Sequence, residues 1–295
     1  MPTNHPLAVG RIDYANAWPL FHYADEETLS PYGVQIVSRK PAELNRALSN
    51  GELAMSAVSS FAYAWHSEQY VLLPDLSVST EGTVHSILLF LKKPLDQVRN
   101  GVIALTNTSA TSVNLLKVLM SVYLEGNPSY ITMEPDLDTM LEQADAALLI
   151  GDTAIQASWR DTGLQVIDLG EMWHRFTGLG MTYAVVAVRK EAAERHREAI
   201  AAVHRAMVDS KRRSLAELEP LVVQACRTLG GEPAYWRRYF HTLQYDFGER
   251  RQQGLRLYFH YAAQLGLLSA SPSSPSSNRN VMLTMPVFAY AKALG

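Results

Sequence analysis

Hydroxyl side chains gather where an apolar stretch of the sequence gives way to a helical one. Residues 105–116 read L-T-N-T-S-A-T-S-V-N-L-L and follow the apolar run Val102–Leu105. Hydroxyls at such a junction can cap the helix. They can also hold an anion there, because the first N–H groups of a helix have no partner within it. For one cluster taken alone, capping is the better interpretation.

Three further polar segments follow strand-like runs. They are Asp13–Asn16, Ser59-Ser60 and Gly151-Asp152-Thr153. Open α/β sheets bind ligands at the carboxyl ends of their strands, so these segments can converge. Two hydroxyl-rich helix starts facing each other would suit a dianion, each helix terminus contributing about 0.3–1 kcal/mol. The predicted ligand-binding residues are Ser59, Ser60, Thr108, Ser109, Ala110, Thr111, Ser112 and Asp152.

The other residues that could carry chemistry give weaker signals. The sequence has no P-loop, no dinucleotide-binding glycine motif and no paired Cys or His spacing of a metal site, so we expect neither a metal nor a cofactor. His85 could act as a base, but alternation along a strand would place it opposite Ser86. His22 and His174 are weaker candidates, and the single cysteine, Cys226, is expected to be a buried thiol.

Aromatic residues cluster in the sequence around the first two of these polar segments. We expect most of them to belong to the hydrophobic core, and one or two to form an apolar wall beside a ligand ring. The six residues are Trp18, Phe21, Tyr23, Phe61, Tyr63 and Trp65.

Apolar runs of strand length alternate with segments of helical period, which is typical of an α/β protein. From Glu191 to about Leu267 the sequence is almost entirely helical in character. The predicted strands are Leu7–Ile12, Val34–Ser38, Leu53–Ala57, Ser86–Leu91, Val102–Leu105, Tyr130–Met133, Ala146–Ile150, Gln165–Leu169 and Thr182–Val188.

The order of these elements repeats once along the chain. Asn16 and Ser109 are 93 residues apart, and Ser59 and Asp152 are also 93 residues apart. Each of the four lies in a polar loop after a strand-like run. The repeat predicts two related α/β lobes with a ligand site in the cleft between them.

The connections between the lobes are predicted from two apolar strands that each end in basic residues, Ser86–Pro94 and Tyr183–Glu191. Two extended crossings would form a hinge. Lobe one would then comprise residues 1–92 and 186–268, with the C-terminal helices, and lobe two residues 93–185.

Composition narrows the class of protein. The 295 residues are 47% hydrophobic, and the formal net charge of −3 comes from interspersed acids and bases, so we expect no nucleic-acid partner. Without a secretory leader or a run of 18 apolar residues, we expect a cytoplasmic protein that does not engage a membrane. Residues 269–295 are typical of a low-complexity linker followed by a short apolar tail. A monomer and a homodimer both remain open.

Several blocks of the sequence resemble chorismate dehydratases of the MqnA type, from the futalosine route to menaquinone. The similarity covers about residues 7–267 in order. The blocks are R-I-D-Y-A-N-A-W-P-L-F from Arg11, P-A-E-L-N-R-A-L-S-N-G-E-L-A-M-S-A-V-S-S-F-A-Y-A from Pro41, L-L-P-D-L-S-V-S-T-E-G-T-V-H-S-I-L-L-F from Leu72, I-A-L-T-N-T-S-A-T-S-V-N-L-L from Ile103, D-A-A-L-L-I-G-D-T-A from Asp145 and I-D-L-G-E-M-W-H-R-F-T-G-L-G from Ile167.

The resemblance implies a two-lobed, periplasmic-binding-protein-like (type II) fold. It also implies a cofactor-free lyase that removes water from chorismate to give 3-[(1-carboxyvinyl)oxy]benzoate. On this basis we hypothesise two catalytic residues: Asn16 bonds the departing C4 hydroxyl or the ring carboxylate, and Ser86 orients the enolpyruvyl group. With no convincing side-chain base, the substrate's own enolpyruvyl carboxylate is the expected proton acceptor. A 1,4-dihydroxy-6-naphthoate synthase of the same fold and a non-catalytic carboxylate-binding protein remain alternatives.

Overall fold

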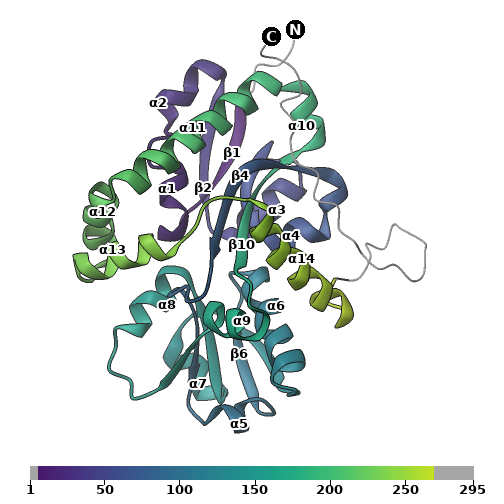
Figure 1. The fold of residues 1–295 in the computed structure, drawn as a ribbon, viewed down its shortest axis with the longest axis vertical. Helices are drawn as coiled ribbons and strands as arrows, with labels where there is room; N and C mark the ends of the chain where they lie inside the picture. The colour runs from purple at the N-terminus through teal and green to yellow at the C-terminus, as the bar shows by residue number, and fades with distance from the viewer. Residues whose placement is uncertain (1–5, 269–295) are drawn as a thin grey trace.

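Ten strands form two separate five-stranded sheets in residues 6–268, the part of the chain that the computed structural model describes. One sheet lies above the other in Figure 1, each flanked by helices. The first sheet contains, in spatial order, β2 (Val34–Arg39), β1 (Leu7–Ile12), β3 (Met55–Ser59), β10 (Met181–Arg189) and β4 (Tyr70–Thr80). The second contains β7 (Ser129–Met133), β6 (Val102–Thr106), β8 (Ala146–Ile150), β5 (Ile87–Leu91) and β9 (Gln165–Asp168).

The two sheets have the same internal arrangement. In the first, β1 pairs in parallel with β2 and β3, and antiparallel β10 lies between β3 and β4. In the second, β6 pairs in parallel with β7 and β8, and antiparallel β5 lies between β8 and β9. This equivalence confirms the repeat predicted from the sequence. We call the first sheet with its helices lobe one and the second sheet with its helices lobe two.

The structure differs from the sequence prediction at the lobe boundaries. The segment Ile87–Leu91 belongs to the second sheet, although the sequence placed it in lobe one. Similarly, Met181–Val185 pairs within the first sheet, although the sequence placed it in lobe two. The chain therefore crosses between the sheets in the segments 81–86 and 169–180, before each of these strands begins. The predicted linker and tail, 269–295, lie outside the described residues.

Strand β4 was not predicted at all. It contains Pro74, which argues against a central strand, and Asp75, whose φ of 57° is left-handed. Its second half alternates buried polar residues, Ser77 and Ser79, with apolar ones, so it lacks the continuous apolar run of its neighbours. Strand β3 is also displaced by two residues from the predicted segment 53–57, which makes Ser59 its last residue.

Helices connect the strands and cover the sheets. In lobe two, β8 is buried over its whole length, which explains its uninterrupted apolar sequence. The α-helices are α1 (Trp18–Phe21), α2 (Glu26–Leu29), α3 (Pro41–Ser49), α4 (Ser60–Trp65), α5 (Leu95–Val98), α6 (Ala110–Val118), α7 (Leu137–Gln143), α8 (Gly151–Ser158), α9 (Leu169–Thr177), α10 (Lys190–Arg195), α11 (Arg197–Ala216), α12 (Glu219–Leu229), α13 (Pro233–Thr242) and α14 (Glu249–Gln264). Short helical turns of other types are η1 (Ala15–Ala17), η2 (Ser30–Tyr32), η3 (Ser67–Gln69) and η4 (Leu119–Tyr123).

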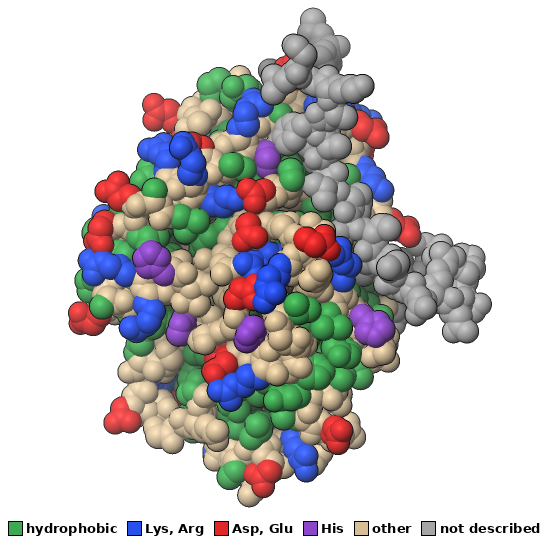
Figure 2. Space-filling view, in the orientation of Figure 1, with side chains coloured by type: hydrophobic (Ala, Val, Ile, Leu, Met, Phe, Trp, Pro, Cys, Tyr) green, Lys and Arg blue, Asp and Glu red, His purple; other side chains and the backbone are tan. Residues whose placement is uncertain are grey.

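The five helices α10–α14 confirm the predicted helical C-terminal region. The last of them, α14, packs against β10 and α4 of lobe one and against α6 of lobe two, so it bridges the lobes (Figure 1). None of the helices in residues 6–268 combines the length and hydropathy that a membrane crossing would require. On the face shown in Figure 2, basic and acidic side chains are interspersed.

Candidate active site

A narrow cavity lies between the lobes, at the ends of the strands that the sequence analysis singled out. It is about 40 Å³ in volume. Five of the ten predicted site residues line it: Asn16, Ser59, Ser86, Ser109 and Ser112. The remaining lining residues are Ile12, Tyr14, Pro41, Ile87, Ile150, Gly151, Tyr183 and Ala184.

Asn16 has the clearest unused bonding capacity in this cavity. It lies in η1, the short turn after β1, and its side-chain Oδ1 is buried without a hydrogen-bond partner. An unpaired buried polar atom costs about 1–3 kcal/mol, so it calls for an explanation. A 180° flip of the side-chain amide exchanges its oxygen and its NH₂ group, so either can form a hydrogen bond with a ligand. The free amide therefore points to a polar ligand in the cavity.

The hydroxyl run of lobe two supplies both a helix cap and cavity lining. Ser109 is the N-cap of α6, and its Oγ accepts a hydrogen bond from the N–H of Ser112 at 3.3 Å. The two hydroxyls also lie 3.2 Å apart. Among the described residues, the first two N–H groups of α6, on Ala110 and Thr111, have no acceptor. Capping and anion binding are therefore compatible here, because the cap leaves part of the helix terminus free.

Thr111 and Ser60 take a different role from the one predicted. Their hydroxyl oxygens lie 3.2 Å apart across the lobe boundary, and Thr111 Oγ1 also accepts the N–H of Phe61 at 3.0 Å. Ser60 donates its hydroxyl to the carbonyl oxygen of Thr182 at 2.8 Å. Both side chains are buried and neither lines the cavity. They join the N-termini of α4 and α6, so the structure places them at a junction between lobes.

Ser59 lines the cavity but already has partners. Its Oγ caps α4 by accepting the N–H of Ala62 at 3.3 Å, and it accepts a second hydrogen bond from the side chain of Asn45 at 3.2 Å. Because the N–H of Phe61 bonds Thr111, the start of α4 has fewer free N–H groups for an anion than the start of α6. The structure therefore favours one helix-terminal anion site rather than two opposed ones.

Of three further predicted positions, Ser86, Thr108 and Ala110, only Ser86 lines the cavity. Ser86 immediately precedes β5, lines the cavity and donates to the carbonyl oxygen of Val84 at 3.3 Å. Thr108 is buried, does not line the cavity and shares a hydrogen bond of 2.7 Å with Thr106. Ala110 is the first residue of α6 and is not among the lining residues.

Asp152 does not line the cavity, although the sequence predicted it as a ligand-binding residue. Ile150 occupies the N-cap position of α8, and Asp152 lies one residue inside the helix. Its Oδ1 accepts the backbone N–H of Ala15, in the other lobe, at 3.2 Å. Burial, the largest cause, raises the pKa of Asp152 to about 7; the hydrogen bond from Ala15 opposes this rise and the nearby carboxylate of Asp13 adds to it.

Two tyrosines supply the apolar wall that was expected from other aromatic residues. Tyr14 and Tyr183 line the cavity, whereas none of the six aromatic residues named from the sequence does so. Of those six, Phe21, Phe61 and Tyr63 belong to the core and Trp65 is 51% exposed. Burial raises the pKa of both Tyr14 and Tyr183, so both phenols stay neutral at physiological pH. The sequence could have indicated Tyr14 as a cavity residue, because it lies in the polar loop that contains Asn16. Nothing in the sequence pattern identified Tyr183.

The histidines considered from the sequence do not line the cavity. Burial lowers the pKa of His22 and of His85, so both are held toward their neutral forms. His85 has a left-handed φ of 60°, and its backbone N–H bonds Asp168, so it belongs to the crossing segment. His174 bonds the carbonyl oxygen of Leu179 at 3.2 Å, as a packing histidine does.

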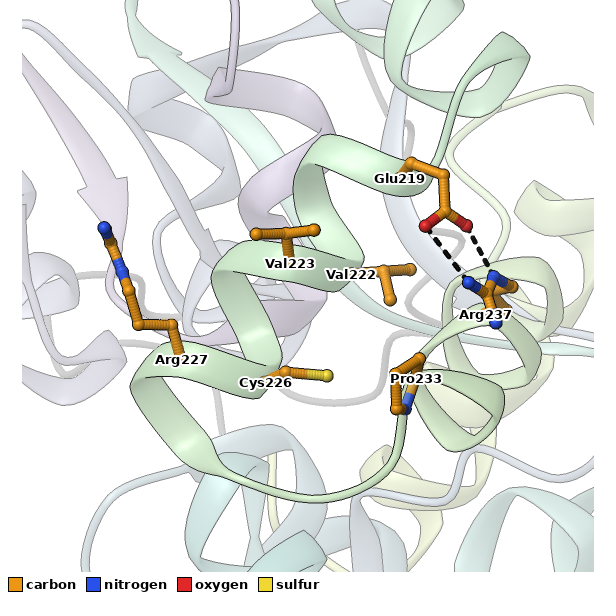
Figure 3. Close-up of a pocket in the computed structure, with 7 residues that line it drawn as sticks. All are labelled: Glu219, Val222, Val223, Cys226, Arg227, Pro233 and Arg237. Atoms are coloured by element: carbon orange, nitrogen blue, oxygen red, sulfur yellow. Dashed lines mark hydrogen bonds and ion pairs between the residues drawn. The ribbon is translucent and has the colours of Figure 1, made fainter.

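A second hollow lies on the surface between α12 and α13, away from the residues above (Figure 3). Cys226 contributes to it and is partly exposed, which corrects the expectation of a buried thiol. The Glu219–Arg237 ion pair closes one side, and the exposed Val223 lies on another. Within residues 6–268 no three His, Cys, Asp or Glu side chains gather closely enough to hold a metal ion.

Comparison with known proteins agrees with the fold and with the predicted resemblance. A chorismate dehydratase of Thermus thermophilus is 34% identical over 277 residues, which is 89% of this chain and 96% of that protein. A 1,4-dihydroxy-6-naphtoate synthase of the same organism is 25% identical over 258 residues, 82% of this chain and 88% of that protein. The periplasmic aliphatic sulphonate binding protein of Escherichia coli is 13% identical but superposes with a TM-score of 0.64, covering 93% of this chain and 96% of that one.

The structural similarity confirms the predicted periplasmic-binding-protein-like fold of two α/β lobes. A family model described as menaquinone biosynthesis matches residues 7–264, which include both lobes and every residue of the cavity. The chain belongs to this menaquinone biosynthesis family.

Proposed function

We propose that the protein is a chorismate dehydratase, a lyase that converts chorismate to 3-[(1-carboxyvinyl)oxy]benzoate and water. The observation that carries the proposal is the unpaired, buried amide oxygen of Asn16 in a cavity lined by four serine hydroxyls. The identity with the Thermus thermophilus dehydratase, 34% against 25% for the naphtoate synthase, supports this reaction over its alternative.

The two sides of the cavity suit the two parts of this substrate. The start of α6, with the hydroxyls of Ser109 and Ser112, would bind a carboxylate, because free N–H groups and the helix dipole both favour an anion there. The rings of Tyr14 and Tyr183 would lie against the unsaturated ring of chorismate. Asn16 would then meet the C4 hydroxyl, and Ser86 the enolpyruvyl group.

The lining of the cavity also bears on where the proton goes. Among its described residues, the ionisable side chains are the phenols of Tyr14 and Tyr183, whose pKa values are raised by burial. Neither is a base at neutral pH. The reaction removes a proton from C3 and hydroxide from C4 and leaves an aromatic ring, so the substrate's enolpyruvyl carboxylate can accept the proton. The task of the protein is then to hold one reactive conformer.

The cavity must enlarge to admit this substrate. Its volume of about 40 Å³ is well below the roughly 300–1,000 Å³ of ordinary small-molecule sites. Since its lining comes from both lobes, separating them is the direct way to open it. We therefore propose that substrate enters an open cleft and that the lobes close on it, which excludes water.

Incubating the purified protein with chorismate and analysing the products by mass spectrometry tests the function. We expect chorismate to be replaced by the aromatic enol ether, at a rate proportional to protein concentration. Recovery of chorismate with only its spontaneous breakdown products would exclude the dehydratase. Saturable binding of chorismate without turnover would instead indicate a carboxylate-binding protein.

Gly151 is expected to govern closure, because it faces Tyr14 across the cleft. Its φ of 63° is left-handed, and a Cβ there would lie 3.0 Å from the Tyr14 ring. A left-handed φ costs a non-glycine residue about 1–2 kcal/mol in the open and closed forms alike, so only the contact with Tyr14 opposes closure. We expect Gly151→Ala to raise KM for chorismate on the order of tenfold, as steady-state kinetics would show.

Gly163→Ala is the matched control for this substitution. Gly163 also has a φ of 63° and lies in lobe two, but nothing lies within 4 Å of its Cβ position. Gly163→Ala should lower the melting temperature through the same backbone strain and leave KM unchanged. If both variants raised KM equally, the Tyr14 contact would have no part in closure.

A further inference from the structure

The loop that carries Asn16 is tied to the opposite lobe by a single carboxylate. Asp152, in the first turn of α8, accepts the N–H of Ala15, the residue directly before Asn16. Ala15 and Asn16 both belong to η1, so the orientation of this short turn sets where the amide of Asn16 points. Asp152 does not itself line the cavity, and therefore acts on the site through this turn.

Helix α8 and the residue after it make two more contacts, with the C-terminal helices α12 and α13. Gln156 donates its side-chain N–H to the carbonyl oxygen of Leu229 at 3.1 Å. Trp159, at the C-terminal end, packs edge-to-face against Tyr235 and Trp236 with ring centroids 5.2 and 5.9 Å apart. Figure 1 shows α8 directly below α13. The bond from Asp152 is thus one end of a helix-long contact that exists only when the lobes are together.

Within residues 6–268, Asp152 has no cationic neighbour that would stabilise its ionised form as an ion pair. The charged group that faces it from the η1 side is another carboxylate, Asp13, and the remaining titratable neighbours are the phenols of Tyr14, Tyr235 and Tyr239. A buried acid without a cationic partner is costly to keep ionised. Such a residue is more readily explained by the one bond it makes to the Asn16 turn than by a gain in stability.

We infer that Asp152 is a positioning residue that holds the Asn16 turn across the closed cleft. The inference rests on the proposed function for its kinetic readout, but the bond to Ala15 does not depend on that function. An uncharged amide oxygen can also accept this hydrogen bond. The role therefore requires an acceptor at this position and does not require a base.

The test compares Asp152→Ala with Asp152→Asn. Asp152→Ala removes the acceptor and should lower kcat about 30-fold with a smaller change in KM, whereas Asp152→Asn keeps an acceptor and should restore most of that loss. A general base at this position would make the two variants equally inactive, which would overturn the inference. Asp136→Ala serves as the control, because Asp136 also accepts a backbone N–H at the start of a lobe-two helix, at 2.9 Å, but caps α7 on the surface.

The pH dependence gives a second discriminating readout. Because burial raises the pKa of Asp152 to about 7, the closed form favours the neutral acid, and ionisation above that pH opposes closure. We expect kcat of the unaltered protein, which reports the closed substrate complex, to fall as pH rises above 7, and Asp152→Asn to lose this decline. A base would give the opposite sign, with activity rising through pH 7.

Hydrogen exchange separates a failure of this inference from a failure of the proposed function. Deuterium uptake in a peptide spanning residues 13–17 should rise in Asp152→Ala but not in Asp152→Asn or Asp136→Ala, whatever the reaction is. Unchanged uptake in Asp152→Ala would refute the positioning role even if chorismate is dehydrated. If uptake rises in Asp152→Ala but the unaltered protein leaves chorismate intact, the proposed function would be refuted and the positioning role of Asp152 would stand.

Discussion

Asn16→Ala should lower kcat for chorismate dehydration on the order of 100-fold, the scale for losing one preorganised hydrogen-bond donor to a developing charge. The buried amide oxygen of Asn16 has no hydrogen-bond partner among the described residues, so removing the side chain should not destabilise the fold. KM should change little, because the interaction strengthens as the C4 oxygen departs with negative charge. Steady-state kinetics with the aromatic product followed by absorbance would measure both constants.

Asn107→Ala is the matched control for this substitution. Asn107 lies in the hydroxyl-rich segment of lobe two, but its side chain bonds Glu134 on the surface and does not line the cavity. Its loss should leave kcat within twofold of the unaltered protein. If Asn16→Ala were as active as Asn107→Ala, the assignment of Asn16 to the chemistry would be wrong.

The sequence pattern predicted the fold well because its strongest signals are local and repeated. The apolar runs of β1, β6 and β8 were found within a residue or so, and their spacing predicted two equivalent sheets. Strand β4 was missed because Pro74 and a left-handed Asp75 interrupt its pattern. Both are tolerated because β4 is an edge strand with an irregularity in its pairing to β10 at this point. The lobe boundaries were displaced because β5 and β10 pair within sheets that their sequence cannot identify.

The candidate site was predicted only in part, because identical hydroxyls have different partners in space. Ser109 and Thr111 are two residues apart in one helical turn, yet Ser109 lines the cavity and Thr111 bonds Ser60 of the other lobe. Residue type and spacing cannot tell these roles apart. They follow from the direction in which each side chain leaves α6 and from which lobe it meets.

Asp152→Asn is expected to stabilise the folded protein at pH 8. The pKa of Asp152 in the folded state, about 7, lies above the 3.8 of an exposed aspartate. An acid whose pKa is higher in the folded state contributes its full stability at pH values below its unfolded-state pKa. This contribution is lost as the pH rises through its folded-state pKa. At 1.36 kcal/mol per unit, ionised Asp152 costs up to about 4 kcal/mol, an upper value because the lobes can open and solvate it. Urea unfolding of both proteins at pH 4 and pH 8 would measure the difference.

The two proteins should differ little at pH 4, where Asp152 is neutral in the folded state and only partly ionised in the unfolded state, and most at pH 8. Asp136→Asn should show the opposite sign at pH 8, because hydrogen bonds from Thr139 hold the pKa of that exposed carboxyl below its usual value. Suppose that Asp152→Asn is more stable only at high pH and that Asp152→Ala is less active. The protein would then retain a destabilising acid because that acid positions the Asn16 turn. Equal stability of Asp152→Asn and the unaltered protein at pH 8 would show that the carboxylate is solvated in the folded state, and the argument from its burial would not stand.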